Sequence, residues 1–136
     1  METFLLIILL IILIWYKIRI KIINNKSTKN LYQCAIEYMN KKNYKKAKKE
    51  FQKLISLGEE NENILFQYGL TLYHLKEYDN SLVSYNKALD LSENNSLIRL
   101  RIYQSIAKIW DIKKEYNKSI IFYNKSIEVS NKILKR

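Results

Sequence analysis

The residue types that carry catalysis or bind metals are scarce in this chain. His74 is the only histidine and Cys34 the only cysteine, so neither a metal cluster nor a convincing Cys–His pair can be assembled. Gly58 and Gly69 are the only glycines, which excludes the glycine-rich loops that cradle phosphates. We therefore expect no catalytic residue, no cofactor and no metal, and hence no enzyme. His74 ends a predicted helix, and the apolar neighbours of Cys34 predict a buried packing residue.

Positive charge is the strongest chemical signal. The formal net charge is +11, and residues 17–53 hold twelve Lys or Arg against two acids. A solvated helix face is one expectation for the lysine run at 41–53, and contact with anionic lipid headgroups is the sharper one. Nucleic acid is disfavoured because Tyr44 and Phe51 are the only aromatic residues among the lysines, and both are expected to face inward. The expected membrane-surface residues are Lys17, Arg19, Lys21, Lys41, Lys42, Lys45, Lys46, Lys48 and Lys49.

An uncharged apolar run, TFLLIILLIILIWY, occupies residues 3–16. As a helix this run is about 21 Å long, which is short for a hydrocarbon core of about 30 Å. Continuing to Ile23 supplies the missing length if the basic side chains between reach back to the headgroups. A cleavable signal would want a basic region before the run and small residues after it, and neither is present. We predict a retained single-pass anchor at 1–23.

The orientation of the anchor in the membrane follows from the flanking basic residues, which all lie on the C-terminal side of the apolar run. The positive-inside rule then places the remainder of the chain in the cytoplasm. The opposite orientation, in a periplasm or lumen, stays open, as do a removed signal and an interfacial helix. Residues 24–29 are polar and are expected to form a short linker.

The remainder of the chain repeats itself. The segment EYDNSLVSYNKALDL at 77–91 returns as EYNKSIIFYNKSIEV at 115–129, and NYKKAKKEFQKLISL at 43–57 is a looser copy. Units one and two are 34 residues apart, and the third follows after 38. Four added residues make about one helical turn, which shifts an apolar face by only about 40°. With no proline and 48% apolar residues, the chain predicts an all-α fold of helix pairs.

Helix pairs at this period resemble the tetratricopeptide repeat (TPR) family. The large apolar, small and aromatic positions of its two helices match at Leu31, Ala35, Tyr38, Tyr44, Ala47 and Phe51, at Leu65, Gly69, Leu72, Tyr78, Ser81 and Tyr85, and at Tyr103, Ala107, Trp110, Tyr116, Ser119 and Tyr123. The resemblance implies three antiparallel helix pairs in a right-handed superhelical stack over 30–136, with units at about 30–59, 62–93 and 96–134, preceded by the single transmembrane helix.

Such a stack implies a docking scaffold that holds a peptide or protein partner in a concave groove. By alignment the groove residues are Tyr32, Ile36, Asn40, Asn63, Phe66, Gln67, Leu70, Tyr73, His74, Arg101, Gln104 and Lys108. Their apolar and basic character suits a hydrophobic anchor with acidic flanks. The alternatives are an envelope-assembly or chaperone-like factor on the far side of the membrane, a subunit of a membrane enzyme complex, and a homo-oligomer whose second copy covers the last helix.

Overall fold

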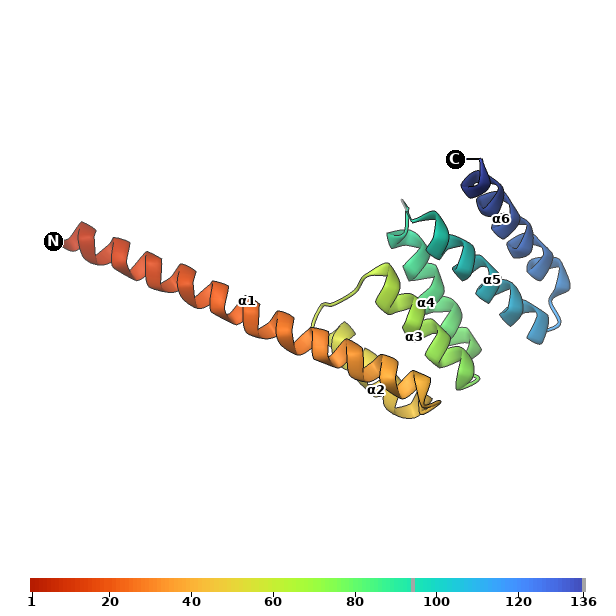
Figure 1. Ribbon diagram of the computed structural model, residues 1–136, viewed down its shortest axis with the longest axis horizontal. Coiled ribbons are helices and arrows are strands. Elements are labelled where there is room, and N and C mark those ends of the chain that lie inside the picture. The colour runs from red at the N-terminus through yellow and green to blue at the C-terminus, as the bar shows by residue number, and fades with distance from the viewer. Residues whose placement is uncertain (94, 136) are drawn as a thin grey trace.

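The computed structural model describes residues 1–93 and 95–135, which form helices and short turns (Figure 1). The helices are α1 (Glu2–Asn40), α2 (Tyr44–Ser56), α3 (Glu62–His74), α4 (Tyr78–Leu91), α5 (Ser96–Ile112) and α6 (Tyr116–Leu134). No strand occurs within the described ranges. The all-α prediction is confirmed. α5 has 17 residues where α3 has 13, so the four added residues lengthen a helix, as the spacing predicted.

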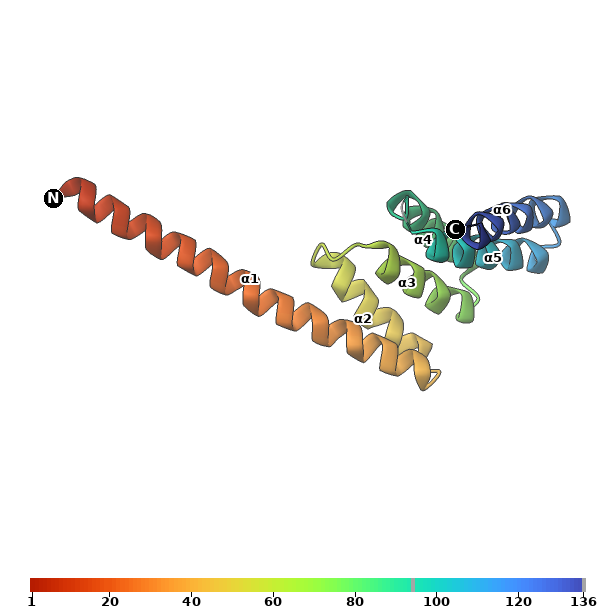
Figure 2. The ribbon, with the colours of Figure 1, turned by 45° about the horizontal axis from the view of Figure 1, so that its top comes forward.

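α1 is one unbroken helix of 39 residues that joins the apolar run to the first repeat. Its N-terminal half projects away from the other helices in both views (Figures 1 and 2). The polar residues expected to form a linker continue the helix, because they include neither proline nor glycine to end it. The repeats are therefore joined to the apolar run by a rigid helix.

The helices pack as antiparallel pairs, α1 with α2, α3 with α4 and α5 with α6. Each pair is joined by a tight turn in which a lysine adopts the left-handed conformation, with φ of 56° at Lys42 and 62° at Lys76 and Lys114. The following amide closes a Schellman motif, as where Glu77 N donates to Leu72 O at 2.9 Å. Gly58 ends α2 in the same conformation, with φ of 80°.

Asparagine side chains mark the starts of three helices. Asn43, Asn61 and Asn95 precede α2, α3 and α5, and each side chain accepts a hydrogen bond from a backbone N–H in the first turn. Such caps satisfy donors that a helix start otherwise leaves open. This local chemistry fixes the helix boundaries without proline.

The core forms two clusters along the stack. One cluster joins the first pair to α3 around Phe51 and Leu54, and the other joins α3, α4 and α5 around Tyr85, Ile102 and Ile106. Buried serines tie α4 to α3: Ser81 Oγ donates to Gly69 O at 2.7 Å, and Ser84 Oγ donates to Leu65 O at 2.8 Å. These bonds hold α3 in the position from which its exposed side contributes to the groove.

Candidate partner-binding groove

A pocket of about 200 Å³ lies between α3 and α5 on the predicted groove. Its lining residues are Leu70, Tyr73, His74, Tyr85, Ser105 and Lys108. The first three come from α3 and the last two from α5, so the stacking of units two and three brings them together. Leu70, Tyr73, His74 and Lys108 all belong to the predicted set.

Tyr85 forms the part of the pocket wall that comes from α4, and the sequence analysis placed its ring in the core without foreseeing this role. The ring lies against the α3 backbone, where Gly69 leaves room for it. Tyr85 is fully buried, and among the described residues its Oη has no hydrogen-bond partner. Burial raises the pKa of Tyr85 to about 12, so its hydroxyl stays protonated. The sequence feature that could have indicated this role is the tyrosine at position 85, where the equivalent residue of unit one is Phe51.

Aromatic rings surround His74 at the edge of the pocket. The ring of Tyr44 stacks on it at 4.4 Å between centroids, and the ring of Tyr73 meets it edge-on at 5.5 Å. Partial burial lowers the pKa of His74 from its usual value of 6.5. At neutral pH His74 is therefore an uncharged wall of the pocket whose charge changes under mildly acidic conditions.

Several predicted groove residues belong instead to the core. Phe66 is 4% exposed and packs against Tyr85 at 5.8 Å, with the Arg101 guanidinium over its ring at 5.2 Å. Tyr32 and Ile36 are half-buried and pack against the cluster around Phe51. The sequence analysis expected these three side chains to be exposed, but Phe66 is buried and Tyr32 and Ile36 are half-buried. The accessible apolar groove is smaller than expected.

The other predicted positions lie on the surface. Asn40, Asn63, Arg101, Gln104 and Lys108 are exposed, and Gln67 is half-buried. Arg101, Gln104 and Lys108 follow one another along α5, and Lys108 alone of these three lines the pocket. Asn40 ends α1 at the turn before α2, so it lies at the edge of the first unit.

The lysine run begins at the turn between α1 and α2 and continues along α2, which turns back beside α1. Because α1 is continuous, Lys41 and Lys42 follow its C-terminal end, about 26 Å along the helix from Ile23. Lys45, Lys46 and Lys49 lie on exposed positions of α2, while Lys48 pairs with Glu77 at 2.7 Å. A bilayer around the apolar run would lie beyond the other end of the stack. Lys17, Arg19 and Lys21 therefore lie beside the apolar run, whereas Lys41 and Lys42 lie at the far end of the first helix pair.

Cys34 is exposed, so the prediction that it packs in the core is wrong. Its counterparts in the later units are Tyr68, which packs against Phe51, and the buried Ile106. Both counterparts are covered by the second helix of the unit before them. α1 belongs to the first unit, and in the described part of the chain no helix precedes it, which leaves Cys34 open to solvent.

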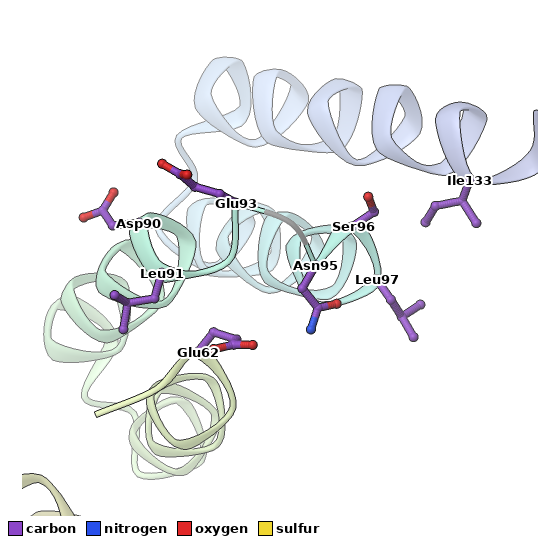
Figure 3. Close-up of a pocket in the computed structure, with 8 residues that line it drawn as sticks. All are labelled: Glu62, Asp90, Leu91, Glu93, Asn95, Ser96, Leu97 and Ile133. Carbon is purple, nitrogen blue, oxygen red and sulfur yellow. The ribbon is translucent and has the colours of Figure 1, made fainter. Parts of the chain in front are cut away.

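A second, larger cavity of about 740 Å³ lies at the end of the stack where α4 passes into α5 (Figure 3). Glu62, Asp90 and Glu93 are among its lining residues, together with the apolar Leu91 and Leu97, and their carboxylates lie apart from one another (Figure 3). It is widely open, and the sequence analysis did not foresee it. No group of three or more His, Cys, Asp or Glu with metal-binding geometry occurs among the residues that the structure describes.

The last helix presents an apolar stripe to solvent. Tyr116, Ile120, Ile127 and Leu134 are between 54% and 80% exposed, and they lie on the side of α6 that borders its contact with α5. In a helical repeat this is the side on which a further helix would pack. The polar residues of α6 do not cover the stripe, so a homo-oligomer stays a prediction.

Comparison with known proteins decides the family. The tetratricopeptide repeat model matches residues 28–61, 62–95 and 100–133, which is more than half of the chain. The chain belongs to the tetratricopeptide repeat family. These TPR units begin close to the predicted ones, and the third begins one turn inside α5, as expected for a unit with an added turn.

A solved structure shares the TPR fold of this chain. It is the crystal structure of MamA, which superposes with a TM-score of 0.72 at 19% sequence identity. The match covers 80% of this chain and 61% of the MamA chain, so this TPR protein spans about three fifths of the MamA length. At this identity the likeness shows the fold alone. No curated protein sequence matches.

Proposed function

We propose that this TPR protein is a membrane-anchored scaffold that binds a peptide segment of a protein partner in the groove between α3 and α5. The observation that supports this most directly is the pocket that Leu70 and Tyr73 share with Lys108. Such a pocket is the kind of site in which one anchoring side chain of a partner supplies much of the binding energy. TPR units are generally interaction modules and not catalysts, which agrees with a scaffold.

Charge defines the partner class. Lys108 is the cationic member of the pocket, and none of its lining residues in the described part of the chain is acidic. Arg101 adds a second cation further along α5. Complementary charge selects partners and speeds their encounter. The groove therefore suits a segment with an apolar anchor and acidic neighbours.

The apolar run of α1 is the proposed anchor. α1 is the one helix in the described ranges that is long and apolar enough to cross a membrane by length and composition, and the side chains of residues 3–23 are exposed. Exposed Leu and Ile side chains in such number are unfavourable in water, because each would gain free energy on leaving it. A lipid environment accounts for them.

The turn before α3 limits how much of α1 the hydrocarbon can cover. Glu59, in this turn, shares a cavity with Lys17, Ile20, Lys21 and Asn25 of α1. Hydrocarbon that extended to Ile23 would surround a carboxylate, which is strongly unfavourable. The run that the hydrocarbon covers is then close to residues 3–16, which form about 21 Å of helix. Because this is shorter than a hydrocarbon core of about 30 Å, either the bilayer thins around the helix or the stack rests in the headgroup layer.

Anchoring changes what a weak groove can achieve. A partner in the same membrane would meet the groove at a raised effective concentration, so modest affinity suffices. Because α1 is rigid, the groove stays at a fixed height above the bilayer. We place the TPR units on the cytoplasmic face, on the strength of the basic residues that follow the anchor.

Two measurements on the full chain test this proposal. Flotation with liposomes after washing at alkaline pH tests the anchor, and the chain is expected to float with the lipid. The chain in lipid nanodiscs is then titrated into a labelled pool of capped random heptapeptides, with fluorescence anisotropy as the readout. Leu70→Asp should abolish binding, whereas Gln52→Asp on the exposed part of α2 should not. Equal binding by the two variants would contradict the groove.

A further inference from the structure

Equivalent aromatic residues stand at one position of the second helix in each repeat. They are Phe51, Tyr85 and Tyr123. Phe51 has no hydroxyl. Tyr85 and Tyr123 each carry one, and the two hydroxyls differ in their hydrogen bonding.

In the third unit the hydroxyl has a partner within the chain. Tyr123 Oη donates to Asp111 Oδ2 at 3.1 Å, so a carboxylate on the first helix of the unit accepts the phenol hydrogen. The residue of the second unit that corresponds to Asp111 is Tyr73, which offers no carboxylate. The Tyr85 hydroxyl therefore lacks the acceptor that its counterpart has.

The surroundings of Tyr85 do not supply a substitute. The two nearby hydroxyls donate to backbone carbonyls, Ser81 Oγ to Gly69 O and Ser105 Oγ to Arg101 O. Both lie close enough to Tyr85 Oη to lower its pKa, but neither accepts its hydrogen in hydrogen-bonding geometry, so Tyr85 Oη has no partner among the described residues. A buried donor without an acceptor is a destabilising feature that a folded chain rarely keeps without a use.

The place of this hydroxyl suggests its use. Tyr85 lines the same pocket as Ser105 and Lys108, so an acceptor that entered the pocket would meet a phenol donor and an ammonium group together. A carboxylate fits both, since hydrogen bonds to an ionised acceptor are short and strong. The Tyr85 Oη is covered in the free chain, so binding requires side chains at the rim to rotate, a common change at interfaces.

We propose that the Tyr85 hydroxyl is a binding residue of the groove that donates to the carboxylate of a Glu or Asp side chain in the bound segment. The bound carboxylate takes the place that Asp111 takes for Tyr123, and Lys108 compensates its charge. This inference rests on the proposed groove function and sharpens it. It identifies an internal acidic residue of the partner as the group that the second unit recognises.

Two peptide pools test the inference. Both are capped, labelled heptapeptides with random flanks, and they differ in the central residue, which is Glu in one pool and Gln in the other. The full chain in nanodiscs should bind the Glu pool about tenfold more tightly, as expected for a hydrogen bond to a charged group. Tyr85→Phe should lose most of this preference, and Lys108→Gln should reduce it.

Tyr123→Phe is the matched control. It removes a hydroxyl that already has an acceptor, so it should lower the thermal midpoint and leave the Glu preference unchanged. Tyr85→Phe removes a hydroxyl without an acceptor, so its midpoint should stay level or rise. A structural role for the Tyr85 hydroxyl predicts the reverse, a lower midpoint with an unchanged preference.

The outcomes separate the two proposals. If wild type binds both pools equally, or if Tyr85→Phe keeps the full Glu preference, the carboxylate inference is overturned and the groove stands. If wild type binds neither pool, the groove and the inference fall together. A Glu preference that disappears in Tyr85→Phe and persists in Tyr123→Phe supports the inference.

Discussion

The ring of Tyr85 lies so close to Gly69 that a Cβ added to Gly69 would stand 2.7 Å from both Cδ1 and Cε1 of the ring. A helix interior ordinarily disfavours glycine by about 1 kcal/mol relative to alanine. Here glycine allows the largest fully buried side chain of the chain to pack against the α3 backbone. The same close packing brings Tyr85 to the wall of the pocket.

Gly69→Ala should therefore destabilise the fold. Overpacking against a buried ring costs about 1–3 kcal/mol, and the gain in helix propensity offsets about 1 kcal/mol, so we expect a net loss of up to about 2 kcal/mol. Denaturant unfolding followed by circular dichroism measures it. The double variant Gly69→Ala with Tyr85→Leu should lose less than the two single variants together. An unchanged midpoint for Gly69→Ala would show that the ring has room to move.

Lys76→Gly should stabilise the chain. Lys76 holds a left-handed backbone conformation, which is unfavourable for a residue with a Cβ, and glycine removes that strain. We expect a gain of about 0.5–1 kcal/mol in the free energy of unfolding. Lys45→Gly, on an exposed position of α2, is the control and should lose about 1 kcal/mol. Equal effects from the two substitutions would mean that the turn conformation is not strained.

Binding of acidic peptides should strengthen as the pH falls below the usual histidine pKa of 6.5. The pKa of His74 is lowered by burial, so its ring is neutral at pH 7 and gains its proton only below its usual pKa of 6.5. Protonation adds a positive charge beside Lys108 while glutamate side chains stay ionised. Anisotropy titrations of the Glu pool at pH 7.5 and 5.5 measure the change. His74→Gln should remove the added affinity, and persistence of the pH effect in that variant would assign it elsewhere.

The turn before α3 should lie at the membrane surface and the turn after α1 should not. Leu57→Cys and Lys42→Cys, each in a Cys34→Ser background, place an environment-sensitive fluorophore at the two ends of the first helix pair. In liposomes the label at residue 57 should shift to the blue and be quenched by spin-labelled lipids, while the label at residue 42 should resemble the soluble dye. Stronger quenching at residue 42 than at residue 57 would support the original hypothesis that the lysine run contacts lipid.

Repetition made the repeat architecture predictable, because equivalent residues 34 or 38 apart face equivalent neighbours. The added turn in α5 and the cap at Gly58 followed from local rules of helix geometry. The prediction of a linker at 24–29 was wrong. Polar residues without proline or glycine do not end a helix, and the packing of α2 against one side of α1 stabilises it. Local sequence cannot show that support.

Exposure at the groove was harder to predict than the groove itself. Phe66 and Tyr73 both belong to α3, yet Phe66 is buried under Arg101 while Tyr73 lines the pocket, and the difference depends on how α5 packs across α3. Cys34 shows the same limit at the end of the stack, where a position that is buried in later units has no helix before it. The proposed role of Tyr85 depends on Tyr73 standing where the third unit has Asp111, and that became visible only with the Tyr123 hydrogen bond.

The most direct test of a peptide-binding groove is photo-crosslinking from the pocket itself. A photoreactive amino acid replaces Leu70 in the full chain, and the same residue replaces Lys49 on the exposed side of α2 as the reference. Both chains are irradiated in nanodiscs with the Glu-centred peptide pool, and the crosslinked peptide is located by mass spectrometry. We predict adducts from position 70 that unlabelled peptide competes away, and none above background from position 49. Equal adducts from both positions would contradict the groove as the binding site.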